Sequence, residues 1–320
     1  MSQHSIMVAL DGSLYSRYAA DLCWRIAQVT GSSVTALHVV DTHGAKQLCG
    51  PDSVAAGEAE GFLRPEEARF FYKNVCEQLH SQAKFLASHY LADALRHGVT
   101  TNFVIAEGDP VSVIVEQAAR HDLVVIGHSP NKNEKAAINR QKLIRLSLAE
   151  ALSHECPRPL LFVQAEVSML SEITVLLSIE HLNELYIDRC LNLAAALDLP
   201  VTFLCLTADL AHTDTAEFVH NLKEANPKLK NLLVEVTTLA AVSRAGGHAF
   251  SEEFILRKGS QQSYTVLPVL PTRKLGKERL TVLGGSTSNL VRTLVQPAML
   301  LMPEECSQPA VLDDLGQAVC

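Results

Sequence analysis

The feature that most constrains the fold is an internal repeat. When the chain is shifted by 167 residues, Val8 aligns with Val175 and Cys23 aligns with Cys190. No gap is needed across a strand-like run, an amphipathic segment and a second strand-like run. A chain of 320 residues is also long enough for two domains, each with its own core. We therefore predict two copies of one structural unit.

The first copy alternates short apolar runs with segments of helical period. The apolar runs lie at residues 5–10, 34–40, 100–106, 123–126 and 160–163. Between them, helical spacing is clear from Tyr18 to Val29, and a second helix is expected from Arg64 to His97. Strand–helix–strand alternation favours parallel strands with right-handed crossovers. The predicted class is α/β, with an open five-stranded parallel sheet flanked by helices in each copy.

The second copy follows the same order with shorter segments. Its expected strands are 172–178, 201–206, 232–239, 264–270 and 298–302, and its expected helices include 215–224 and 249–258. We predict a first domain at 1–165, a second at 172–303, and a flexible tail at 304–320, which is rich in acids, Gly and Pro.

Composition excludes several classes of function. The net charge of −8 gives no support for binding nucleic acid or an acidic membrane surface. No segment approaches the roughly 18 apolar residues that span a bilayer, and the amino terminus lacks a signal-peptide pattern. The eight cysteines are scattered without a C-x-x-C pair, which is typical of free thiols in a cytoplasmic protein. The histidine spacing predicts no metal site, and no catalytic residues are expected.

Several motifs, taken together in order, resemble the universal stress protein family. They are Val8-Ala-Leu-Asp-Gly-Ser13, Glu107-Gly-Asp-Pro110, His121-Asp-Leu-Val-Val-Ile-Gly127, Ser147-Leu-Ala-Glu150 and Pro157-Arg-Pro-Leu-Leu-Phe-Val163. The resemblance covers residues 5–164, and residues 172–302 are similar to a diverged second copy. It implies a nucleotide-binding α/β fold with strand order 3-2-1-4-5. It also implies that the tandem copies form, within one chain, the dimer usual in the family, while further homodimerisation stays open.

The resemblance also implies candidate nucleotide contacts in the first copy. Many members of the family bind ATP or AMP, and these are the cofactors that the resemblance suggests here. Asp11 stands at the acidic position after strand one, and Val40 lies where the backbone flanks the base. Gly127 and Ser147 match the first glycine and the hydroxyl of the phosphate loop G-x2-G-x9-G-[ST]. Asp11 could equally serve only as a helix cap.

The phosphate loop itself departs from the family pattern. Pro130 stands at the second glycine position and Leu146 at the third. The family separates the first and third glycines by 13 residues, whereas Gly127 and Leu146 are 19 apart (146 − 127). Proline has no amide donor, and a leucine side chain prevents close approach of a phosphate. We therefore expect the usual phosphate cradle to be absent from the first copy.

A basic segment, residues 131–145, replaces the glycine-rich loop. It carries five basic residues and one acid, and no glycine or proline occurs between Asn131 and Pro157. Residues 134–154 could therefore form one continuous helix. The basic side chains are either a solvated face or a contact surface for phosphate or for an acidic protein partner.

The second copy has the complementary defect. Ser178 replaces the acid at the position of Asp11, and its fourth strand is followed by Pro271 instead of the first glycine. Gly284, Gly285 and Ser286 precede its last helix, which indicates either an anion site or a glycine turn that only starts the helix. Matching the serines before the last helices gives an offset of 139, and matching the prolines after them gives 138.

We predict a cytoplasmic tandem universal stress protein that acts as a non-catalytic stress-response or regulatory module. Its nucleotide binding would be lost or weakened. The alternative is a module that binds an adenine nucleotide in one copy through non-standard contacts. Nucleotide hydrolysis is the least supported reading, because no base or set of metal ligands is visible.

Overall fold

The structure is a computed structural model that describes residues 4–42, 65–129, 147–178, 183–207, 215–225, 233–238, 265–275, 278–281, 286–293 and 296–304. Its helices are α1 (Leu14–Thr30), α4 (Pro65–Arg96), α5 (Pro110–Ala118), α6 (Leu148–Glu155), α7 (Glu184–Leu197), α8 (Thr215–Ala225) and α11 (Thr287–Thr293). Its strands are β1 (Ser5–Ala9), β2 (Ser33–Val40), β3 (Thr101–Glu107), β4 (Leu123–Gly127), β5 (Leu160–Val163), β6 (Leu170–Ser178), β7 (Val201–Thr207), β8 (Leu233–Thr238), β9 (Thr265–Leu275), β10 (Glu278–Thr281) and β11 (Ala298–Pro303).

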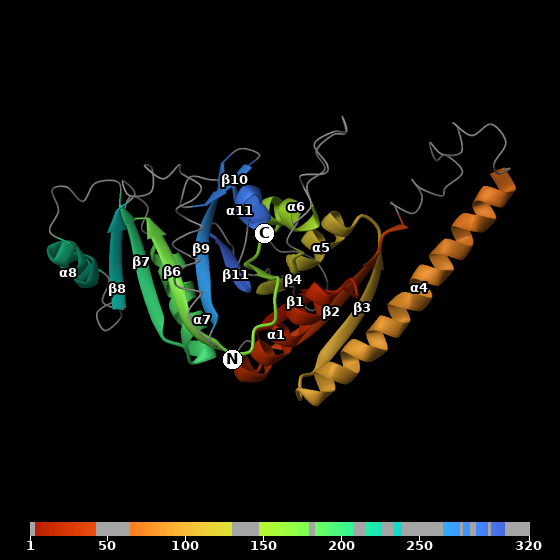
Figure 1. Ribbon diagram of the computed structural model, residues 1–320, viewed down its shortest axis with the longest axis horizontal. Coiled ribbons are helices and arrows are strands. Elements are labelled where there is room, and N and C mark those ends of the chain that lie inside the picture. The colour runs from red at the N-terminus through yellow and green to blue at the C-terminus, as the bar shows by residue number, and fades with distance from the viewer. Residues whose placement is uncertain are drawn as a thin grey trace, which may run out of the picture.

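The described strands form one continuous sheet (Figure 1) in the order β3-β2-β1-β4-β5-β11-β9-β6-β7-β8, with β10 paired to β9. Each half has the predicted parallel order 3-2-1-4-5. The two halves meet where β5 pairs with β11 in the antiparallel direction. The two predicted sheets are therefore confirmed in topology and fused edge to edge, which removes one exposed sheet edge from each half.

The strand register confirms the repeat. Val8 pairs with Ala36 in the first half, and Val175 pairs with Phe203 in the second, so both partners keep the offset of 167 residues. At the junction Leu161 pairs directly with Leu300. These two residues are also equivalent within their halves, because Leu161 pairs with Val125 of β4 and Leu300 with Val269 of β9. A pseudo-twofold axis passes between them, and the offset that aligns the serines is the correct one.

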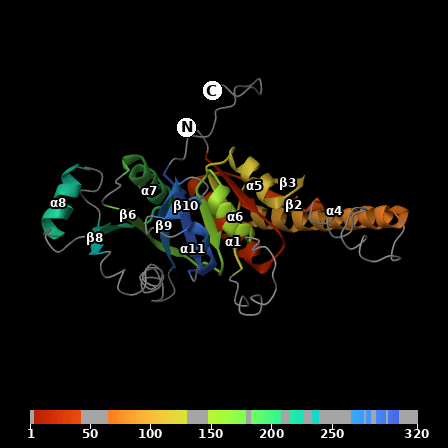
Figure 2. The ribbon, with the colours of Figure 1, turned by 90° about the horizontal axis from the view of Figure 1, so that it is seen from above.

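Alternating side chains of the strands build a core on each face of the sheet. On one face, Val8 and Leu161 pack with buried residues of α1, α4 and α7. On the other face, Met7 and Phe162 pack with α5, α6 and α11. Helices α6 and α11 lie next to each other over the junction, and α1 and α7 contact each other on the opposite face (Figures 1 and 2).

The structure differs from the sequence predictions in three places. A continuous helix over residues 134–154 is wrong, because Ser147 is extended (φ −62, ψ 160) and α6 begins after it. Strand β9 runs to Leu275 instead of residue 270, and β10 folds back on it as an antiparallel hairpin. Strand β6 begins at Leu170, so the link between the halves is shorter than predicted. The predicted helix 249–258, the basic segment 131–145 and the tail after Glu304 lie outside the described residues.

The domain boundaries stay predictions, since strands of both halves belong to one sheet. Within the ranges given above, no helix combines the length and the apolar character needed to cross a membrane.

Candidate functional site

The loop after β1 presents Asp11 at the carboxyl edge of the sheet. The Asp11 side chain is exposed, and its Oδ1 accepts a hydrogen bond of 2.8 Å from the amide of Ser13. Ser13 is the N-cap of α1, since its hydroxyl accepts from the amide of Ser16 at 3.1 Å. Asp11 therefore shapes the turn but does not cap the helix. Gly12 makes this turn with φ +82, a conformation that favours glycine.

Gly127 and Val40 lie at the ends of neighbouring strands of the same edge. A Cβ at Gly127 would lie 2.4 Å from the carbonyl carbon of Tyr15 and 2.5 Å from the nitrogen of Ser16. The packing of α1 on β4 therefore requires glycine here, whether or not a ligand binds. Val40 is buried, and its carbonyl oxygen accepts from the amide of Gly108 at 3.1 Å.

Ser147 begins α6 with a complete capping box. Its hydroxyl accepts from the amide of Glu150 at 3.3 Å, and its own amide donates to Oε2 of Glu150 at 2.7 Å. The other oxygen, Oε1, accepts from Nε and Nη2 of Arg292 at 2.7 and 2.6 Å. Since Arg292 belongs to α11, a carboxylate of the first half and a guanidinium of the second half close this helix end together.

Three influences act on the pKa of Glu150. Burial alone would raise it, but the hydrogen bonds from Ser147 and the charge of Arg292 outweigh burial, and the net pKa lies below that of an ordinary glutamate. Glu150 is thus ionised at neutral pH, although only 6% of its side-chain surface is exposed. A negative charge is already in place at the amino end of α6, where phosphate would be favoured by the helix dipole.

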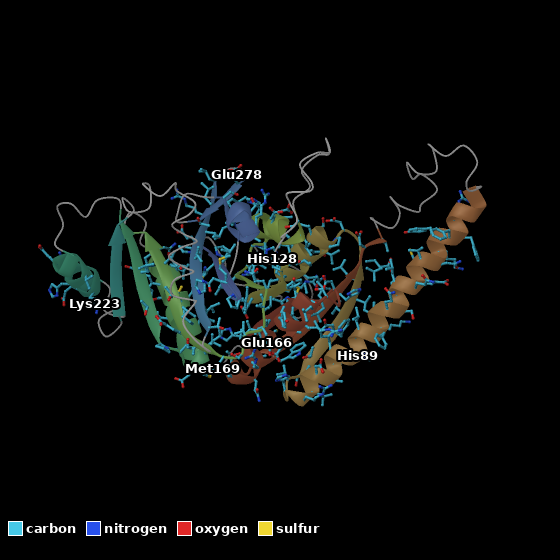
Figure 3. The ribbon with its side chains drawn as sticks, viewed as in Figure 1. His89, His128, Glu166, Met169, Lys223 and Glu278 are labelled. Carbon is cyan, nitrogen blue, oxygen red and sulfur yellow. The ribbon has the colours of Figure 1, made fainter. Side chains whose placement is uncertain are left out.

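Beside this pair lies His128, which the motifs did not single out. It follows Gly127 directly, is 5% exposed, and lies in the middle of the molecule (Figure 3). Its ring meets that of Phe162 edge to face at 6.3 Å between centroids. Its Nε2 has no hydrogen-bond partner among the described residues. Burial lowers the pKa of His128, although the backbone of Val291 and the charge of Glu150 act in the opposite direction.

A polar cluster continues from α6 into the second half. The Ser153 hydroxyl donates to Oγ1 of Thr287 at 3.1 Å, and the amide of Arg279 donates to Nδ1 of His154 at 3.3 Å. Arg279 also donates to the carbonyl of Cys156. Sequence reasoning missed this cluster because its members are far apart in the chain and meet only at the pseudo-twofold axis.

The second half presents different groups at the equivalent edge. Ser178 ends β6, and Pro271 occupies the position of Gly127 inside β9, which continues into the hairpin with β10. The Ser286 hydroxyl lies 3.0 Å from that of Ser288 at the start of α11. Gly284 and Gly285 lie outside the described residues, and the proposed anion site there stays a prediction.

Neither a metal cluster nor an activated thiol is found in the part of the chain that the structure describes. No group of three or more His, Cys, Asp or Glu side chains there could hold a metal ion. Cys23, Cys76, Cys156 and Cys190 are free thiols. Burial raises the pKa of Cys190 to about 12 and raises that of Cys23 further, which suppresses their thiolate forms.

The comparisons with known proteins agree with the motifs. The sequence profile described as the universal stress protein family matches residues 3–164. A universal stress protein from Archaeoglobus fulgidus DSM 4304 has a similar structure, with 12% identity and a TM-score of 0.62 over 95% of this chain and 100% of that one. A protein of Pseudomonas aeruginosa UCBPP-PA14 described as a universal stress protein is 16% identical, with a TM-score of 0.54 over 94% of each chain. These structures show the fold alone. No curated protein matches the chain.

Proposed function

Since the chain belongs to the universal stress protein family, we propose that it is a non-catalytic stress-response module whose nucleotide binding is lost or weakened. The observation that carries this proposal is the closed end of α6. The Ser147 amide, which would face a phosphate, donates to the Glu150 carboxylate, and Arg292 holds that carboxylate in place. A phosphate would have to displace a buried, paired negative charge, or lie next to it.

The departures around this helix end support the same proposal. Pro130 and Leu146 replace two loop glycines, and the second half has Ser178 in place of the acid and Pro271 in place of the first glycine. The proposed role is then that of a fixed pseudo-dimer which recognises a partner. Its location would be the cytoplasm, in keeping with its free thiols, and cell fractionation tests this.

Equilibrium dialysis with labelled ATP and AMP tests the loss of binding. We expect no saturable binding in the micromolar range. Glu150→Gln, which removes the resident charge and keeps the side-chain shape, should strengthen any residual ATP binding. Glu155→Gln, on the exposed end of the same helix, is the matched control. Micromolar binding by the unaltered protein would contradict the proposal.

The second candidate is an adenine-nucleotide-binding module, and the geometry of Asp11 favours it. Asp11, Val40 and Gly127 follow three neighbouring strands and meet at one edge of the sheet, and the Asp11 carboxylate is exposed there. If ATP binds with micromolar affinity and Asp11→Ala abolishes that binding, this candidate is correct. Phosphate release above that of Asp11→Ala would support an enzyme instead.

A further inference from the structure

A cavity of about 290 Å³ lies far from the edge discussed above, on the opposite face of the sheet. It is formed between α1 and α7, the two helices that contact each other below the junction in Figure 1. Its floor includes Leu300, which pairs with Leu161 on the pseudo-twofold axis. Both halves therefore supply walls, and the cavity depends on their fusion.

The lining is mostly apolar with a charged side. Apolar residues come from both first helices and from the central strands: Ile6, Ile26, Leu193, Ala196, Leu300 and Met302. The charged residues are Arg158, Arg189 and Asp122. Two guanidinium groups against one carboxylate leave an excess of one positive charge, since arginine stays protonated at physiological pH.

The three charged groups are held in place by the backbone. Nη2 of Arg158 donates to the carbonyl of Ala119 at 2.7 Å, and Arg158 is only 6% exposed. Nη1 of Arg189 lies 3.4 Å from the carbonyl of Pro303. Asp122 accepts from the Ser5 amide at 2.9 Å and lies 3.6 Å from the ring of His4, so its charge is partly compensated locally.

The repeat shows where the charge was introduced. Arg189 of α7 is equivalent to Leu22 of α1 by the offset of 167 residues, and Leu22 is a buried core residue. The second half thus places a cation against the junction where the first half places an apolar side chain. This asymmetry gives the cavity one cationic wall beside an apolar chamber.

From this geometry we infer that the cavity binds a small amphipathic carboxylate, with its apolar body between α1 and α7 and its acid group at Arg189. A guanidinium provides paired donors that match a carboxylate. The volume lies at the lower end of the range of about 300–1,000 Å³ typical of small-molecule sites, which excludes large ligands. Because the ligand contacts both halves, its binding would stabilise their arrangement.

Titration calorimetry with octanoate and with octanol tests the site in the full-length protein. The two probes share the apolar tail and differ in charge. We expect saturable binding of octanoate at one site, about tenfold tighter than octanol. Arg189→Gln should remove this preference and leave octanol unaffected. Arg17→Gln, an exposed arginine on α1 outside the cavity, is the control for charge.

A second variant tests the location. Ala196 is exposed at the cavity, so Ala196→Trp should block both probes without disturbing the core. Val29 is its equivalent on α1 and is 60% exposed, so Val29→Trp should leave binding unchanged. The inference is overturned if octanoate shows no saturable binding, if octanol binds as tightly, or if Ala196→Trp binds octanoate like the unaltered protein. None of these outcomes depends on whether ATP binds.

Discussion

The two halves share one order of strands, but their fourth strands end in different ways. In the first half β4 stops at Gly127, because the backbone of α1 comes so close that a Cβ would lie 2.4 Å from Tyr15. In the second half the equivalent Pro271 lies within β9, and the chain continues through Leu275 into a hairpin. The same fold thus tolerates two opposite solutions at the edge where this family is expected to bind its ligand.

The difference shows that a family landmark can persist for a structural reason. Gly127 matches the first glycine of the phosphate loop, yet helix packing alone requires it. Ser147 matches the loop hydroxyl, yet it caps α6. Matching residues at these positions therefore cannot by themselves indicate that a nucleotide binds.

The largest effect is expected for Gly127→Ala. The added methyl group would overlap backbone atoms that cannot move without shifting α1, so we expect a loss of about 3 kcal/mol in the free energy of unfolding. Pro271→Ala, at the equivalent place, should cost about 1 kcal/mol or less. Urea denaturation monitored by circular dichroism measures both. Equal costs would refute the structural role of Gly127.

A smaller loss is expected for Arg292→Met, which breaks the ion pair that joins the halves. The buried Glu150 carboxylate would lose its partner, a change that costs about 3–5 kcal/mol for a fully buried pair. Since the Arg292 side chain is 34% exposed, we expect about 2 kcal/mol. The second substitution Glu150→Gln should recover part of this loss, and a double-mutant cycle checks it.

The same variant should change the acid limb of stability. The pKa of Glu150 is lowered in the folded protein, so its contribution is full above the ordinary glutamate pKa and is lost as the pH falls through the folded value. Without Arg292 that loss should begin at a higher pH. Melting temperatures between pH 7 and pH 3 would reveal the shift, and superimposable curves would contradict it.

Helix capping should contribute less than the ion pair. Ser147→Ala removes the hydroxyl that accepts from the Glu150 amide, and we expect a loss of about 1 kcal/mol. Ser286→Ala, at the equivalent position, should cost less, because the Ser286 hydroxyl pairs with the Ser288 hydroxyl. Chemical denaturation of the two single variants gives the comparison, and the reverse order would be evidence against it.

The smallest effect concerns His128, whose equivalent in the second half is Thr272. Burial lowers the pKa of His128, so between its folded pKa and the ordinary value the unfolded chain binds more protons, and stability rises with pH. His128→Leu should flatten this slope between pH 5.5 and pH 7.5. His154, whose pKa burial also lowers, should keep a residual slope. An unchanged slope in His128→Leu would show that His128 does not contribute.

Much of the fold followed from residues that interact locally. The spacing from Tyr18 to Val29 predicted α1, apolar runs predicted the central strands, and the repeat from Val8 to Val34 predicted two halves with one topology. Period and turn chemistry act within a few residues, so these elements could be read along the chain. The family resemblance, confirmed over residues 3–164, supplied the strand order.

Contacts between distant residues could not be read in this way. Nothing along the chain linked Glu150 to Arg292, placed His128 beside α11, or set Arg189 against the cavity between α1 and α7. The sequence alone determined the α/β units, their duplication and the loss of the loop glycines, because each of these is written in residues close together in the chain. The tertiary structure decided that the halves fuse through Leu161 and Leu300, and that a carboxylate closes α6. Those outcomes depend on which surfaces meet across the pseudo-twofold axis, and only the folded chain brings them together.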